Sequence, residues 1–275
     1  MSYPLDPGGP DDYPVRVGSM LLTLVDPHRG YERAYNRWYE RDHYYDGCLI
    51  GPYNFAGARW VATRELKDLR WPAASTVVAD PIVAGSYLAI YWIEDGHHTD
   101  WDTWASEQVR WLYGNGRGFP ERSHVHTATF DYLGVGYRDR DPVPVALALD
   151  HRYGGLVVAW FDARDGRPAT ELSDLLAVEA VPALLRDSPI EIAAAWRPRP
   201  EFRTARDAPM ALGSVGGGED RLCQLFFVDG DPRDALGPLR EYTAAVEERG
   251  WADTRLVAPF LRTEVGTDRY ADQLW

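Results

Sequence analysis

Two side chains near the end of one predicted helix have the types and spacing for proton transfer. His43 follows Tyr39 by four residues, so a helix over residues 29–45 places both on one face. An imidazole changes charge near neutral pH and is a common general acid or base, with Asp42 or a strand residue fixing its tautomer. Alternatively, His43 only caps carbonyl groups at the helix end. We predict that His43 is catalytic and that Tyr39 assists it.

Arg59 is a second candidate, inside a predicted strand over residues 53–64. Because side chains alternate along a strand, Arg59 and Trp60 point to opposite faces. A buried guanidinium needs an anionic partner, which is either a bound carboxylate or enolate or an internal Asp or Glu. Both alternatives stay open. As a catalytic residue, Arg59 would stabilise an oxyanion.

His124 and His126 share one face with Phe130 on a predicted strand over residues 124–133, because side chains alternate along a strand. If this face meets a ligand, His126 is a second acid–base group; if it meets the core, both are satisfied core histidines. We predict a catalytic role for His126. The predicted substrate-binding residues are Trp38, Tyr91, His124, Trp60 and Phe130.

The sequence does not favour a metal or cofactor site. Residues 97–100, His-His-Thr-Asp, invite a metal interpretation, but no His-x3-His or His-Glu-x-x-His helix is present, and Thr99 or Asp100 as an N-cap explains the run. The glycine-rich stretch 213–218 precedes a strand, so it is not a nucleotide-binding loop. Haem binding is a weaker alternative, with few cations for its propionates. We therefore expect neither a metal nor a cofactor.

The elements that position these residues occur twice along the chain. Four apolar runs each end on an acidic residue; these residues are Asp26, Glu94, Asp162 and Asp229. Asp26 and Asp162 are 136 positions apart, and Trp60 and Trp196 share this offset. An offset near half of the chain length indicates two copies of one structural unit.

Each copy is predicted to contain strand, helix, strand, strand, helix and strand. In the first copy the second helix begins after Thr99 or Asp100, and in the second copy Pro182 should kink or shorten the first helix. Right-handed crossovers turn this order into a four-stranded antiparallel sheet with both helices on one face. The fold class is thus α+β, with two ferredoxin-like repeats whose sheets pack face to face as a pseudo-dimeric α/β barrel.

We divide the chain into four parts on this basis. They are a flexible N-terminal segment (1–15), a first ferredoxin-like repeat with the predicted active cleft (16–136), a linker (137–153) and a mainly structural second repeat (154–275).

A local motif adds a family resemblance. Residues 38–43, Trp-Tyr-Glu-Arg-Asp-His, precede Ala-Arg-Trp at 58–60. This pair resembles the helix end and strand of the EthD-like branch of the dimeric α/β-barrel superfamily, in a tandem, fused form. The resemblance implies that only the cleft of the first copy keeps the functional residues, because the positions 136 residues later in the second copy hold different residue types. His43, Arg59 and Tyr39 correspond to Glu179, Ala195 and Leu175.

Composition limits the partners. The 275 residues carry a net charge of −13 without a basic stripe, which argues against nucleic acid and an anionic membrane surface. Residues 1–13 resemble neither a signal peptide nor an anchor, and two cysteines in different halves form no disulfide framework, so we expect a cytoplasmic protein.

With 11 Trp and 16 Tyr, a flat hydrophobic or aromatic small molecule is the expected partner. Fusion of the repeats permits a monomer, and a homodimer stays possible.

The function that we predict is a cofactor-independent enzyme that acts on a small aromatic or polycyclic substrate. His43 would move a proton next to a carbonyl or phenol during dehydration, cyclisation or isomerisation, so the enzyme would be of lyase or isomerase type. The alternatives are a cofactor-free monooxygenase, which the family resemblance implies, and a non-catalytic protein that binds a hydrophobic ligand.

Overall fold

The computed structural model describes residues 14–200, 208–214 and 216–275. The expected N-terminal segment lies outside the described residues except for its last two positions. The first half contains β1 (Val17–Pro27), α1 (Glu32–Trp38), η1 (Tyr39–His43), η2 (Tyr45–Leu49), β2 (Asn54–Val61), α2 (Arg64–Asp68), β3 (Tyr87–Glu94), α3 (His98–Gly114) and β4 (Arg122–Tyr137). The second half contains η3 (Val145–Leu147), β5 (Gly155–Ala163), α4 (Ala169–Glu179), α5 (Val181–Leu185), β6 (Ile190–Pro198), β7 (Arg221–Val228), η4 (Pro232–Ala235), α7 (Leu236–Glu248) and β8 (Ala252–Arg262).

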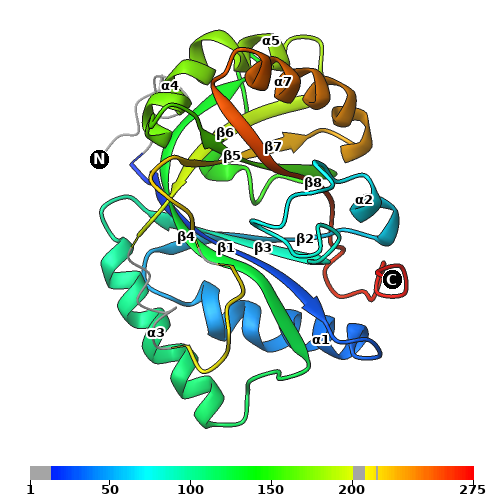
Figure 1. Ribbon diagram of the computed structural model, residues 1–275. Helices are drawn as coiled ribbons and strands as arrows, with labels where there is room; N and C mark the ends of the chain where they lie inside the picture. The colour runs from blue at the N-terminus through cyan, green and yellow to red at the C-terminus, as the bar shows by residue number, and fades with distance from the viewer. Residues whose placement is uncertain (1–13, 201–207, 215) are drawn as a thin grey trace.

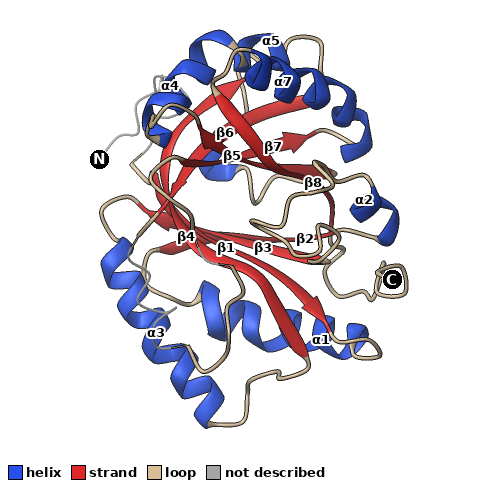
Figure 2. Cartoon of the chain, in the orientation of Figure 1, coloured by secondary structure: helices blue, strands red, loops and turns tan. Residues whose placement is uncertain are grey.

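The strands close into one antiparallel barrel with the order β1-β3-β2-β8-β5-β7-β6-β4. Each half contributes four adjacent strands in the ferredoxin-like order, namely β4-β1-β3-β2 and β6-β7-β5-β8, and the helices cover the outside of each sheet (Figure 2). The two sheets also join at their edges, where β4 pairs with β6 and β2 pairs with β8 (Figure 1). The predicted fold class is therefore confirmed.

The barrel interior is packed with apolar side chains from both halves. Trp60, Trp92, Trp160 and Trp196 all point into it and are fully buried. The rings of Trp92 and Trp196 stack with their centroids 4.8 Å apart. The interior therefore acts as the shared hydrophobic core of the two repeats.

The helices differ in detail from the sequence prediction. α1 starts at Glu32, three residues later than predicted, and is followed by two π-helical turns, η1 and η2, which extend the helix to Leu49, past its predicted end at residue 45. α3 begins at His98 with His97 as its N-cap residue and no side-chain cap, so the expected N-cap at Thr99 or Asp100 is wrong. The helix expected over 171–185 is interrupted at Ala180, because Pro182 starts the new helix α5, as its rigid ring predicts. None of the described helices is long and apolar enough to cross a membrane.

A β-bulge changes the alternation in β4. Leu24 pairs with His126 and Val25 with His124, so one extra residue of β4 lies between these two pairs. His126 consequently points into the barrel, whereas His124 points to the outer face that the helices cover. The prediction that the two histidines share one face is therefore wrong.

Candidate functional site

A cavity of about 70 Å³ lies between the outer face of the first repeat's sheet and its helices. Its wall combines apolar side chains with a few polar ones, and part of it is a loop outside regular secondary structure. The lining residues are Leu21, Thr23, Tyr39, His43, Gly47, Cys48, Trp101, Ala105, Val109, Arg122, His124, Thr127, Ala208, Met210 and Leu212.

The π-helical turns determine the place of His43. Its ring stacks on Trp38 with centroids 4.6 Å apart and meets the edge of Tyr39 at 5.2 Å. Gly47 lies against the other side of the imidazole, since a Cβ atom there would be 2.3 Å from Nδ1 of His43. Wide helical turns of this kind often occur at functional sites. Here they allow a histidine ring to lie flat between an indole and a glycine backbone.

His43 is uncharged in this environment. Burial, with the positive charge of Arg122 as the next cause, holds the pKa of His43 well below its usual range. Neither ring nitrogen forms a hydrogen bond within residues 14–200, 208–214 and 216–275, where only ring contacts hold the side chain. The neutral imidazole at the cavity wall therefore has a free lone pair that can accept a proton.

A polar chain crosses the cavity wall from β4 to β1. Arg122 Nε donates to His124 Nε2 at 3.2 Å, so the proton of the neutral imidazole lies on Nδ1. Nδ1 then donates to Thr127 Oγ1 at 2.8 Å, and Thr127 Oγ1 is 3.0 Å from Thr23 Oγ1. Burial and Arg122 lower the pKa of His124 to about 3. Because both nitrogens are engaged, His124 holds Arg122 in place.

Tyr39 forms the opposite wall together with a buried partner. Its hydroxyl is 2.9 Å from the hydroxyl of Tyr91, which lies behind it on β3. Burial raises the pKa of both phenols well above the usual range and raises the pKa of the Cys48 thiol to about 12. All three groups are thus protonated at neutral pH, and Cys48 is not an activated nucleophile.

Arg59 does not line the cavity. Its Nη1 donates to Asn36 Oδ1 at 2.9 Å and to Glu40 Oε1 at 3.3 Å, and the guanidinium lies over the ring of Tyr39 at 4.3 Å. The internal carboxylate that the sequence left as an alternative is therefore its partner. Arg59 supports Tyr39 from behind, and the oxyanion role expected for it does not fit this position.

Three other predicted site residues point into the packed barrel. His126, Trp60 and Phe130 are fully buried members of the interior or its wall. His126 Nδ1 bonds to Ser214 Oγ at 2.8 Å, and burial lowers its pKa to about 3. These residues cannot meet a ligand in the cavity, since they lie on the other face of the sheet.

The structure brings Tyr39, His43 and His124 together at the cavity, with Trp38 and Tyr91 directly behind them. Sequence reasoning missed Arg122, Thr23 and Thr127. Their position depends on the bulge in β4, and we find no local signal that separates Arg122 from the many other arginines of the chain.

The cavity does not fit a haem. Its volume of about 70 Å³ is smaller than the roughly 150 Å³ that hold benzene in a protein. His124 uses both nitrogens in hydrogen bonds, and His126 lies in the packed interior. His43 could offer a ring nitrogen, but the space beside it does not hold a macrocycle. Within the described residues, no group of three or more His, Cys, Asp or Glu side chains is placed to hold a metal ion.

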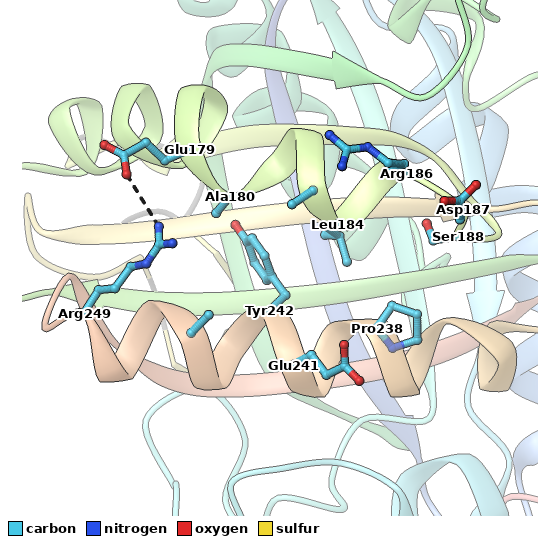
Figure 3. A pocket seen from close by; sticks show the side chains of 12 residues that line it. Glu179, Ala180, Leu184, Arg186, Asp187, Ser188, Pro238, Glu241, Tyr242 and Arg249 are labelled. Carbon is cyan, nitrogen blue, oxygen red and sulfur yellow. Dashed lines mark hydrogen bonds and ion pairs between the residues drawn. The ribbon is translucent and has the colours of Figure 1, made fainter.

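A larger hollow of about 370 Å³ lies on the second repeat between α4–α5 and α7 (Figure 3). Glu179, the counterpart of His43 by sequence offset, lies at its edge and pairs with Arg249 at 3.5 Å. Both side chains are about half exposed, and Tyr242 forms part of the floor. This hollow lies on the outer surface of the helices, and its titratable groups include the carboxylates of Glu179, Asp187 and Glu241 but, among the described lining residues, no histidine.

Comparisons with known proteins identify the fold. The sequence matches no family model and no curated protein. Among solved structures, an anthrone oxidase-like protein superposes with a TM-score of 0.53 at 10% identity, covering 91% of this chain and 94% of that chain. A protein from Fusobacterium nucleatum subsp. nucleatum that is named as a monooxygenase by proposal superposes with a TM-score of 0.50 at 9% identity, covering 90% of this chain and 94% of that chain. At such identities the likeness concerns the fold alone, so the chain has the dimeric α/β-barrel fold with both ferredoxin-like halves in one polypeptide.

Proposed function

We propose that the protein is an enzyme that moves a proton on a small aromatic or enolisable substrate, with His43 as the general base. The observation that carries this proposal is the neutral imidazole of His43, without a hydrogen-bond partner in the described chain, at the wall of a cavity between sheet and helices. Binding pockets for small molecules combine apolar walls with a few placed polar groups, and this cavity has that character. Lyase or isomerase chemistry follows from such a base.

The environment of His43 determines which proton it can take. A protonated His43 is unfavourable in the empty cavity, because the site is buried and Arg122 is near. A substrate that becomes an anion as it loses the proton offsets both effects. His43 is therefore suited to protons of phenols, or of carbon next to a carbonyl, where the negative charge stays in the cavity.

Elimination of 5-nitrobenzisoxazole tests the base directly. A base removes the C3 proton, the N–O bond breaks, and the released 2-cyano-4-nitrophenolate absorbs visible light. We expect His43→Ala to lower kcat/KM by roughly a hundredfold or more, as removal of a general base does. The matched control is Glu179→Ala in the second repeat, which should leave the rate unchanged.

The pH dependence provides a second readout. Because the pKa of His43 is lowered, the base form persists as pH falls, and the rate should stay level well below the pH of 6.5 at which an ordinary histidine is half protonated. A wild-type rate that halves near pH 6.5, or a His43→Ala enzyme of full activity, would contradict the role of His43. A wild type without activity but with ligand affinity would indicate a binding protein.

The second candidate function is a cofactor-free monooxygenase. The names of the two fold neighbours, anthrone oxidase-like protein and monooxygenase, favour it. Anthrone separates the two reactions. Removal of its C10 proton gives the enolate, and a proton returned to its oxygen gives the enol tautomer without use of O2, whereas oxygenation to anthraquinone and water consumes one O2 for each anthrone. An oxygen electrode combined with product absorption decides between them. Oxygen uptake that depends on His43 would favour the monooxygenase.

A further inference from the structure

Arg122 is a cation at the cavity wall, and none of the residues that the structure describes gives it a carboxylate partner. Nε donates to His124 at 3.2 Å and Nη2 donates to the hydroxyl of Tyr113 at 2.9 Å. Nη1 is buried and has no hydrogen-bond partner among the described residues. The guanidinium lies over the indole of Trp38, at 4.5 Å from the ring centroid. An orphaned donor on a charged group is costly unless something accepts from it.

Other arginines in the first repeat show what is missing. Arg117 pairs with Asp42 and Asp46, and Arg59 pairs with Glu40, although Nη2 of Arg59 is also without an acceptor. Arg70 donates to the backbone carbonyls of residues 82, 84 and 85, so both of its terminal nitrogens have acceptors. No ion pair to Arg122 occurs within the described part of the chain. The partners of Arg122 are instead a neutral histidine and a phenol, which fix its direction and leave its charge uncompensated.

We propose that this cavity binds its ligand as an aromatic oxyanion, a phenolate or enolate, whose oxygen accepts from Nη1 of Arg122. This inference rests on the proposed function and names the substrate class of the same site. One orphaned nitrogen suits a single oxygen, whereas a carboxylate prefers two parallel donors. Arg122 replaces Arg59 as the residue that holds the negative charge. His124 is the positioning residue that holds Nε.

The arrangement also explains why His124 must be neutral. Only an unprotonated Nε2 can accept from Arg122, and the charge of Arg122 together with burial keeps it unprotonated. The chain then continues from Nδ1 of His124 to the hydroxyl of Thr127. Contacts with His124, Tyr113 and Trp38 orient the guanidinium before the ligand arrives, which lowers the entropy that is lost on binding.

The test compares three one-ring probes of similar size: 4-nitrophenolate, 4-nitrobenzoate and neutral nitrobenzene. In the wild type we expect 4-nitrophenolate to bind most tightly, and the bound probe to ionise at lower pH than free 4-nitrophenol, as seen by its visible absorption. Arg122→Gln should weaken 4-nitrophenolate binding by roughly tenfold to a hundredfold, the effect of a lost charged hydrogen bond, without changing nitrobenzene binding. Arg110→Gln, on the exposed side of α3, is the matched control and should bind all three probes like the wild type.

Two results would overturn the proposal. One is a wild type that binds nitrobenzene or 4-nitrobenzoate better than 4-nitrophenolate; the other is an Arg122→Gln protein that keeps its preference for the phenolate. Arg122→Lys keeps the charge but loses the fixed direction, so an intermediate affinity is expected, and thermal melting shows that each variant is folded.

His43→Ala separates this inference from the proposed function. If that variant binds 4-nitrophenolate and still eliminates 5-nitrobenzisoxazole, the role of His43 is wrong while the oxyanion site remains.

Discussion

The space between sheet and helices differs between the two repeats. In the first repeat it contains a cavity lined by polar groups of Tyr39, His43, Arg122 and His124. In the second repeat the same space is filled by side chains that are buried and apolar; these are Leu172, Leu176, Phe161, Phe226 and Leu239. A polar contact in this second layer is the hydroxyl of Tyr242, which donates to Gln224 Oε1 at 2.8 Å.

The types of side chain that line a space, more than its volume, therefore identify the candidate site. The surface hollow of the second repeat has about 370 Å³ against about 70 Å³ for the cavity. Yet its edge is an exposed ion pair, Glu179 with Arg249, and such pairs contribute little to binding or stability. The small cavity is instead lined by Arg122, which has no carboxylate partner in the described part of the chain, and by the imidazole of His43, which has no hydrogen bond there.

The largest effect is expected in the filled layer. Leu176→Ala removes a fully buried side chain from the second repeat and should lower the free energy of unfolding by about 2–5 kcal/mol. Val109→Ala, at the edge of the existing cavity on α3, should lower it by only about 1 kcal/mol. Urea unfolding of both variants measures this. Equal losses would mean that the two layers are packed alike.

Acid should weaken the first repeat selectively. All seven histidines precede residue 154, so the second repeat has none. Burial lowers the pKa of His126 to about 3 in the folded protein, against about 6.5 when unfolded, so the unfolded state binds more protons between these values. Stability is therefore lost as pH falls below 6.5, by about 2 kcal/mol from His126 at pH 5.

Hydrogen exchange at pH 7 and pH 5 would locate this loss. We expect β1 and β4 to lose more protection than β5 and β7, and His126→Gln, which keeps a donor for Ser214, to reduce the dependence on pH. An acid effect spread evenly over both repeats would argue against neutral buried histidines as its cause.

A smaller effect concerns access to the cavity. A one-ring ligand needs more than about 70 Å³, so lining side chains have to move, and Met210 belongs to a loop outside regular structure. Met210→Ala should tighten nitrobenzene binding by roughly threefold to tenfold, because less packing is displaced. Leu184→Ala at the hollow of the second repeat is the control and should have no effect. Unchanged affinity in Met210→Ala would place the entry elsewhere.

The sequence predicted the architecture because its signals are repeated and local. Alternating apolar runs, acidic strand ends and the offset of 136 fix two strand–helix units, and Pro182 interrupts its helix as expected. The site was predicted less well. Tyr39, His43 and His124 reach the cavity, but the bulge in β4 moves His126 to the other face, and a bulge leaves no clear mark in the alternation.

The oxyanion-binding role expected for Arg59 is the one that we propose for Arg122, which the sequence did not single out. Both arginines lie on strands and are followed closely by a ring-bearing residue. Only the three-dimensional structure shows that Arg59 forms an ion pair with Glu40, whereas no described carboxylate pairs with Arg122. Charge balance of this kind depends on contacts between residues far apart in sequence. The π-helical turns at His43 were likewise not predicted, since their residue types are the same as those of an ordinary α-helix.

The covalent connection between the halves has a consequence for how such a protein can change. In a symmetric homodimer every substitution appears twice, so a mutation that fills one pocket with leucine also destroys its twin. A single chain is free of this coupling. One half can become rigid and carry the stability of the barrel, while the other retains a hollow and an uncompensated charge that a lone subunit could hardly tolerate in duplicate.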